Sequence, residues 1–190
     1  MSARIRSFIA VDLEDEGVRR KLISAQRLLS RTGADLKLVE AENLHVTIRF
    51  LGEVPRGLLD RIVEELSKVR FRPFRAELRG VGVFPRLSRP RVIWAGFKGG
   101  GDELIALFKE IEPRLRGLGI RPERNPFHPH VTLARVRSGR KREELIRQVM
   151  DLADEEFGEI VVTRFKLKRS TLTPRGPIYS TLHEFEAETG

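Results

Sequence analysis

One four-residue pattern occurs twice in this chain and restricts what the chain can fold into. His45-Val46-Thr47-Ile48 returns 85 positions later as His130-Val131-Thr132-Leu133. Each copy alternates polar and apolar residues, which is typical of a β-strand with one buried face, because successive side chains of a strand point to opposite sides. The histidine and threonine of a copy would share one face, and its apolar residues the other, together with Phe50 beside the first copy. The sequence therefore predicts two strands that each present a His-x-Thr pair on a polar face.

The sequence around the two motifs repeats the same order of elements. Apolar periodicity predicts strand, helix, strand, helix and strand in each half of the chain. In the first half the expected strands are 7–13, 44–51 and about 75–84, and the expected helices are 18–32 and 58–69. In the second half the expected strands are 92–97, one that begins at 130, and about 160–168. The expected helices there are 102–115 and 145–150, and 178–186 is expected to form an additional strand.

This repetition predicts one domain over residues 1–190, with an α+β fold of two pseudo-symmetric β-α-β-α-β lobes. The approximate repeats are 5–85 and 91–170, followed by the C-terminal strand at 178–186. A pseudo-two-fold axis between the halves would bring their equivalent histidine strands to opposite sides of one cleft. Both His-x-Thr pairs would then face a single substrate.

The charge composition favours a polyanionic partner. Lysine and arginine number 36 against 27 aspartates and glutamates, a net charge of +9, and arginine is in the majority. A planar guanidinium binds phosphate through two N–H groups and stacks on bases, so this composition fits nucleic acid. The alternative is a thermophilic source whose surface carries ion-pair networks. Charge alone does not choose between the two.

The absence of cysteine removes several classes of site. The chain has no cysteine, which excludes disulfides, thiolate zinc sites and a thiol nucleophile. No apolar run approaches the length of about 20 residues that a membrane span needs, and the N-terminal residues lack the apolar region of a signal peptide. We therefore expect a soluble, cytoplasmic protein that does not enter a membrane.

Two histidines with two hydroxyls can catalyse acid–base chemistry. The unperturbed pKa of histidine is about 6.5, so one imidazole can be neutral while another is protonated near neutral pH. On opposite sides of a phosphorus atom, the neutral ring can take a proton from water while the imidazolium gives one to the leaving oxygen. The threonine hydroxyls can donate hydrogen bonds to the non-bridging oxygens. This scheme requires no metal and no cofactor.

The two motifs and their surroundings resemble the 2H phosphoesterase superfamily. The segments HVTIRFLG at 45–52 and PHVTLAR at 129–135 carry the resemblance, and RSFIAV at 6–11 and GPIY at 176–179 extend it. The chain is most similar to the bacterial and archaeal RNA 2′,3′-cyclic phosphodiesterases, historically called 2′-5′ RNA ligases. The resemblance implies antiparallel-type sheets facing a central cleft. It also implies hydrolysis of a terminal 2′,3′-cyclic phosphate to a 2′-phosphate, with 2′-5′ ligation as the reverse reaction.

The resemblance also implies a role for each motif residue. His45 would protonate the departing 3′-oxygen as general acid, and His130 would activate water as general base. Thr47 and Thr132 would bind the phosphate. The residues themselves leave the division between the two histidines open.

Two further residues are candidates for substrate binding. The family's second motif carries an arginine at the position of Arg135, which implies a phosphate or base contact. Strict alternation would send Arg135 to the face opposite His130, so a β-bulge or the strand end must redirect it. Phe8 is a candidate for stacking on a base, and the alternative is a core aromatic residue.

A metal site and a nucleotide loop are both disfavoured by the sequence. His128 and His130 could ligate a metal with His45 or His183, but Pro129 interrupts the spacing and no carboxylate lies nearby in sequence. The glycines at 99–101 lack the order of a phosphate-binding loop, so we expect a turn there.

A run of basic residues has two possible explanations. Arg137, Arg140, Lys141 and Arg142 could follow an RNA backbone, or they could keep the start of a helix soluble. Positive charge at a helix N-terminus opposes the helix dipole, which slightly favours the binding explanation.

The expected partner is RNA with a 2′,3′-cyclic phosphate or a 2′-5′ linkage, for example a tRNA fragment, bound by a monomer. A related 2H phosphoesterase acting on a small cyclic phosphate or a 2′-5′ oligoadenylate is the enzymatic alternative. A non-catalytic RNA-binding module is the alternative from another class. Matched motifs in both halves disfavour that module, because binding alone needs no acid and base.

Overall fold

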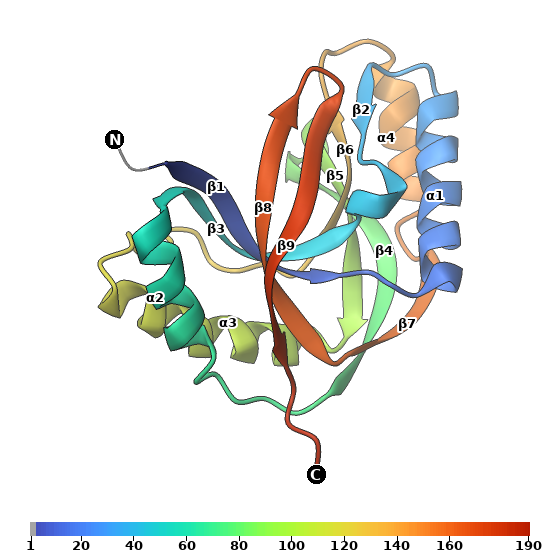
Figure 1. The fold of residues 1–190 in the computed structure, drawn as a ribbon. Coiled ribbons are helices and arrows are strands. Elements are labelled where there is room, and N and C mark those ends of the chain that lie inside the picture. The colour runs from blue at the N-terminus through green and yellow to red at the C-terminus, as the bar shows by residue number, and fades with distance from the viewer. Residues whose placement is uncertain (1–2) are drawn as a thin grey trace.

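One antiparallel sheet runs through the part of the molecule that the computed structural model describes, residues 3–190 (Figure 1). The strands are β1 (Arg4–Asp12), β2 (Leu36–Leu38), β3 (His45–Pro55), β4 (Phe74–Arg86), β5 (Arg89–Gly99), β6 (Val131–Val136), β7 (Glu156–Val162), β8 (Arg164–Thr173) and β9 (Gly176–Glu186). The α-helices are α1 (Glu16–Arg31), α2 (Arg56–Leu66), α3 (Gly101–Gly117) and α4 (Arg142–Asp151), and one turn of 3₁₀-helix covers Ala41–Asn43. The order in the sheet is β7-β4-β5-β6-β3-β1-β8-β9, and β2 pairs with β6 outside this order.

The helices form where the apolar periodicity predicts them. In α1 the side chain of Asp15 caps the N-terminus by accepting a hydrogen bond of 2.9 Å from the Val18 amide. The helix ends before Gly33, whose φ of 80° suits glycine because a Cβ would strain the backbone there. The buried face of α1 packs against the sheet, and α1 lies beside α4 while α2 lies beside α3 (Figure 1).

The two histidine motifs meet at the centre of the sheet. Strands β3 and β6 pair at Val46 and Val131, which are equivalent residues of the two motifs. Outward from this point, β3 is followed by β1, β8 and β9, and β6 is followed by β5, β4 and β7. Equivalent strands therefore occupy equivalent positions on either side of the junction.

The two halves exchange one strand each, which the sequence does not indicate. The strand expected at 75–84 is β4, and it pairs with β5 of the second half. The strand expected at 160–168 consists of two strands, β7 and β8, and β8 pairs with β1 of the first half. Each side of the sheet is therefore completed by a strand from the other sequence repeat.

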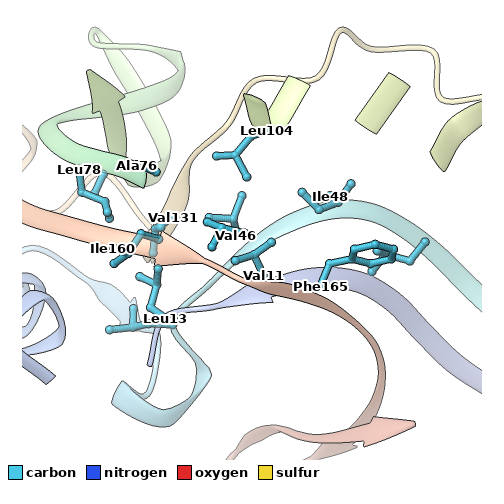
Figure 2. Close-up of a cluster of buried hydrophobic side chains, with 14 of the residues drawn as sticks. Val11, Leu13, Val46, Ile48, Ala76, Leu78, Leu104, Val131, Ile160 and Phe165 are labelled. Atoms are coloured by element: carbon cyan, nitrogen blue, oxygen red, sulfur yellow. The ribbon is translucent and has the colours of Figure 1, made fainter. Parts of the chain in front are cut away.

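The apolar residues of the motifs anchor them in the core. Val46 and Val131 are fully buried, and Figure 2 shows them in one cluster with Leu104 of α3. Burying these side chains on the helix-covered face leaves the histidines and threonines on the opposite face. No helix within residues 3–190 is long and apolar enough to cross a membrane.

Candidate active site

The junction of β3 and β6 brings the two His-x-Thr pairs together. Antiparallel pairing at Val46 and Val131 sets His45 across from Thr132, and Thr47 across from His130, on the face away from the core. His45 and both threonines line a cavity of about 210 Å³. The charge of His130 also lowers the pKa of His45, so the two imidazoles lie within electrostatic reach of each other.

The same backbone contact orients both imidazoles. Nδ1 of His45 lies 2.6 Å from the carbonyl oxygen of Asn43, and Nδ1 of His130 lies 2.5 Å from that of His128. A carbonyl only accepts, so Nδ1–H donates in both rings and Nε2 is the nitrogen that can exchange protons. Nε2 of His45 lies 2.8 Å from Oγ1 of Thr47. The arrangement provides two histidines of the same tautomer.

Burial lowers the pKa of both histidines. For His45 the desolvation effect is the largest, and the hydrogen bond to Asn43 and the charge of Asp12 oppose it. For His130 desolvation is again the largest cause, opposed by the hydrogen bond to His128. Both rings are therefore biased toward the neutral form, and a bound phosphate anion would shift them toward the imidazolium.

A cluster of charged residues lies beside His45. Lys168 on β8 donates hydrogen bonds of 2.8 Å to both carboxylate oxygens of Asp12, and Lys166 donates one of 3.1 Å to the same carboxylate. Burial alone would raise the pKa of Asp12, but the hydrogen bonds and charges of Lys168 and Lys166 outweigh it and lower that pKa. Asp12 is therefore an anion held near His45. This cluster was not predicted from the sequence, although charges alternate with apolar residues along β8.

His130 has an aromatic environment instead. The ring of Phe84 lies 5.0 Å from that of His130 in an edge-to-face arrangement, and Trp94 lies 6.3 Å away. Trp94 and His128 also line a cavity of about 670 Å³ that extends to the glycine-rich turn before α3. The two histidines therefore share a tautomer but differ in their surroundings.

Phe50 does not lie on the apolar face, so that prediction is wrong. β3 has extra residues relative to β1 at Ile48 and at Leu51, and the bulge at Ile48 shifts the alternation of the strand before Phe50. Arg49 consequently points inward and pairs with Glu112 at 2.8 Å, with both side chains buried. Phe50 is 44% exposed, and its ring stacks on Phe8 at 6.0 Å.

A β-bulge also redirects the side chain of Arg135. β6 has one extra residue, Leu133, relative to β5, which is the bulge that the position of Arg135 requires. Arg135 is exposed and lines the 210 Å³ cavity with Thr132. Each motif thus ends in a bulge, and Arg135 holds the position in β6 that Phe50 holds in β3.

Phe8 is a buried aromatic residue in this structure. It is 1% exposed, and its ring packs 5.2 Å from His45 and 4.8 Å from Tyr179. This environment fits the core alternative, with Phe8 supporting the imidazole of His45. Tyr179 lines the cavity itself, and it was not predicted as a site residue, although it lies in the GPIY segment.

The remaining candidates lie outside this arrangement. Gly100 has a φ of 81° and forms the turn that opens α3, as the sequence predicts. His183 is exposed on β9 and lies 4.7 Å from Phe185. Within residues 3–190 no three His, Asp or Glu side chains are grouped to hold a metal ion.

Comparison with known proteins places the chain in a family. The family model described as LigT-like phosphoesterase matches residues 11–94 and 98–179. A protein of Aeropyrum pernix named RNA 2′,3′-cyclic phosphodiesterase is 46% identical over 159 residues, covering 84% of this chain and 90% of that protein. A protein of Archaeoglobus fulgidus with the same name is 44% identical over 182 residues, covering 96% and 100%.

Solved structures with the same fold agree with this result. TT0787 of Thermus thermophilus superposes with a TM-score of 0.79 at 34% identity, covering 95% of this chain and 97% of that chain. The crystal structure of E. coli LigT in apo form gives a TM-score of 0.79 at 27% identity, covering 99% and 100%. The chain therefore belongs to the LigT-like phosphoesterase family.

Proposed function

We propose that this protein hydrolyses RNA ends that carry a 2′,3′-cyclic phosphate and leaves a 2′-phosphate. The observation that carries the proposal is the pairing of β3 with β6, which brings two histidines of the same tautomer together with two threonines, beside a cavity lined by His45 and both threonines. The relatives from Aeropyrum pernix and Archaeoglobus fulgidus, both named RNA 2′,3′-cyclic phosphodiesterase, support the choice of substrate.

In the proposed reaction His130 is the general base and His45 the general acid. Nε2 of His130 takes a proton from water as the water oxygen forms a bond to phosphorus. Nε2 of His45 gives a proton to the 3′-oxygen as its bond to phosphorus breaks. The charge of Asp12 partly opposes the lowering of the His45 pKa, whereas the charge of Lys168 adds to it, so the division of roles between the two histidines follows the family resemblance. No carboxylate is among the causes that shift the pKa of His130.

Thr47, Thr132 and Arg135 bind the phosphate in this proposal. The two hydroxyls donate hydrogen bonds to the non-bridging oxygens, where negative charge increases in the transition state. In the structure Oγ1 of Thr47 is within hydrogen-bond distance of Nε2 of His45, so this hydroxyl must turn toward the phosphate when substrate binds. Arg135 adds a positive charge at the same cavity.

The terminal base stacks on Phe50 or Tyr179 rather than on Phe8 in this proposal. Phe50 is 44% exposed and Tyr179 lines the cavity, whereas Phe8 is 1% exposed and has no free ring face. The ring of Phe8 instead packs against the imidazole of His45.

Ligation is the same opening of the cyclic phosphate by a different nucleophile. If a 5′-hydroxyl takes the place of water, the same acid and base form a 2′-5′ linkage. We propose that hydrolysis dominates in dilute RNA because water is in large excess. We further propose that the protein acts as a monomer, in the cytoplasm, on RNA fragments such as tRNA ends. Gel filtration would check the monomeric state, and cell fractionation would check the location.

The direct test is to identify the product. The protein is incubated in EDTA with a short RNA that ends in a 2′,3′-cyclic phosphate, and the end is analysed by mass and by sensitivity to phosphatase. A 2′-phosphate is expected. A 3′-phosphate, or an unchanged RNA, would contradict the proposal. Turnover confined to small cyclic phosphates or 2′-5′ oligoadenylate would favour the related enzymatic function.

A further inference from the structure

Four arginines line a third cavity, at the end of β6. The cavity measures about 210 Å³ and lies between the start of β5, the end of β6 and the start of α4. Its basic lining residues are Arg89, Arg91, Arg137 and Arg142, and all four are exposed. We call this the arginine cavity. The sequence run 137–142 supplies only half of these arginines, and the β4–β5 hairpin supplies the others.

The arginine cavity has no negative charge in its lining. The other lining residues are Pro90, Val136, Ser138, Gly139 and Leu145. None of the four arginines forms an ion pair with another residue of the described range 3–190. Four guanidinium groups around one cavity repel one another, and an anion bound between them would remove this repulsion.

The guanidinium of Arg142 lies over Gly139, which also lines the cavity. A Cβ added at Gly139 would lie 2.8 Å from Nη2 of Arg142, so the guanidinium occupies the space that a side chain at 139 would need. Lys141, just before α4, has a φ of 55°, which is rare for a residue with a side chain. This turn directs the start of α4 toward the cavity.

The arginine cavity and the catalytic cavity are lined by neighbouring residues at the end of one strand. Arg135 lines the catalytic cavity, and Arg137 follows it two positions later. The amide of Arg137 donates a hydrogen bond of 2.9 Å to the carbonyl of Asp35, so the chain remains paired beyond the end of β6. At a rise of about 3.3 Å per residue, Arg137 lies about 7 Å along the strand from Arg135. Lys37 and Arg175 add positive charge to the catalytic cavity.

We propose that the arginine cavity binds a backbone phosphate of single-stranded RNA, upstream of the end that reacts at His45 and His130. Guanidinium groups suit this ligand because each can donate two parallel hydrogen bonds to phosphate oxygens. The upstream direction rests on the proposed function, whereas the phosphate site itself does not. An oligonucleotide would occupy both cavities, whereas a mononucleotide has only its terminal phosphate to place in the catalytic cavity.

A binding experiment tests this site without requiring turnover. The probe is a fluorescent single-stranded RNA of about eight nucleotides that ends in a 2′-phosphate. Its affinity is measured for the wild type and for Arg89→Ala/Arg142→Ala over a range of salt concentrations. We expect about ten-fold weaker binding by the variant. The slope of log K against log salt should also decrease by about 0.7 for each phosphate that the variant no longer neutralises.

A matched variant controls for the loss of charge. Arg56→Ala/Arg116→Ala removes the same charge from exposed positions on α2 and α3, on the side of the molecule away from α4 (Figure 1). Binding by this variant should stay close to that of the wild type. Equal weakening of both variants, or no weakening of the first, would overturn the proposed phosphate site.

Kinetic measurements then test its connection to the reaction. The Arg89→Ala/Arg142→Ala variant should hydrolyse a 2′,3′-cyclic mononucleotide at the wild-type rate. Its kcat/KM should fall about ten-fold for the oligonucleotide with a cyclic phosphate end. Equal kcat/KM of variant and wild type on the oligonucleotide would overturn the upstream path. If the wild type turned over neither substrate, the proposed function would fail, and the binding experiment would still decide on the arginine cavity.

Discussion

Replacing Glu112 by alanine tests the buried ion pair that holds the bulge of β3. The side chains of Arg49 and Glu112 are 8% and 9% exposed. Glu112 accepts hydrogen bonds from Nε of Arg49 at 2.8 Å and from the Glu123 amide at 2.9 Å. Arg49 also donates to the carbonyls of Phe50 and Arg121. The pair therefore connects the strand after the first motif to α3 and to the loop that follows α3.

The expected loss in Glu112→Ala is large because it leaves a buried charge without its partner. Removing one member of a buried pair costs about 3–5 kcal/mol of the free energy of unfolding. For a chain of this size that loss lowers the melting temperature by roughly 6–20 °C. The double variant Arg49→Met/Glu112→Leu removes both charges. It should recover to within about 2 kcal/mol of the wild type, because no unpaired charge remains.

Chemical denaturation of the wild type, both single variants and the double variant measures these values. The phosphodiesterase activity of the folded double variant then reports whether the bulge still places Phe50 and Thr47 correctly. A loss below about 1 kcal/mol in Glu112→Ala, typical of exposed pairs, would refute the reasoning. A double variant as unstable as the sum of the single variants would refute it as well.

Four further predictions concern the site. Replacing either His45 or His130 by alanine should lower kcat/KM by about 10²- to 10⁴-fold without changing the fold observed by circular dichroism. Near-wild-type activity of either variant would show that the replaced histidine takes no part in the reaction. Since burial lowers the pKa of both histidines, the bell-shaped kcat/KM profile should have its maximum below about pH 6.5, and a maximum above pH 8 would contradict this. The free energy of unfolding should also fall as the pH drops from about 6.5 through the lower histidine pKa values of the folded state, because the unfolded chain binds more protons there. Arg135→Ala should raise KM about ten-fold, with partial recovery in Arg135→Lys, and an unchanged KM would exclude a phosphate contact. Phe50→Ala should weaken substrate binding while changing the free energy of unfolding by less than about 1 kcal/mol, whereas Phe8→Ala should cost about 3–5 kcal/mol of that free energy. The reverse pattern would make Phe8 the residue on which the base stacks.

The sequence predicts the elements of this fold better than their arrangement. Apolar periodicity identifies α1 and the two histidine strands because periodicity depends on which face of each element is buried. It contains no information on which strand lies next to which. The exchange of β4 and β8 between the repeats therefore becomes visible only in the sheet order.

In the active site, too, the sequence pattern predicts which residues lie on the strands better than it predicts where their side chains point. The repeated motif predicts that His45 and His130 face one cleft, and their strands indeed pair. Alternation fails at the last residue of each motif, because a bulge inserts one extra residue there and no residue type in this sequence marks it. The position of Phe50 was therefore predicted wrongly. The bulge at Arg135 was expected only because the family resemblance required that side chain in the cleft.

The charges around His45 correspond to a pattern in the sequence of β8. Lys166 and Lys168 alternate with buried apolar residues along β8, a pattern that is typical of a strand with one solvated face. In the structure both lysines are buried instead and contact Asp12. Strand alternation identifies a polar face, but it does not distinguish bulk solvent from the wall of an active site.

A substrate with sulfur in place of the 3′-oxygen tests the central claim most directly. A thiol is a much stronger acid than an alcohol, with a pKa of about 8.5 for the cysteine side chain, so a thiolate leaves without receiving a proton. If His45 is the general acid, His45→Ala should regain most of the lost rate on the 3′-thio cyclic phosphate. His130→Ala should remain slow on both substrates, because its water still needs a base. Rescue of His130→Ala instead would reverse the two roles, and rescue of neither variant would contradict the acid–base pair.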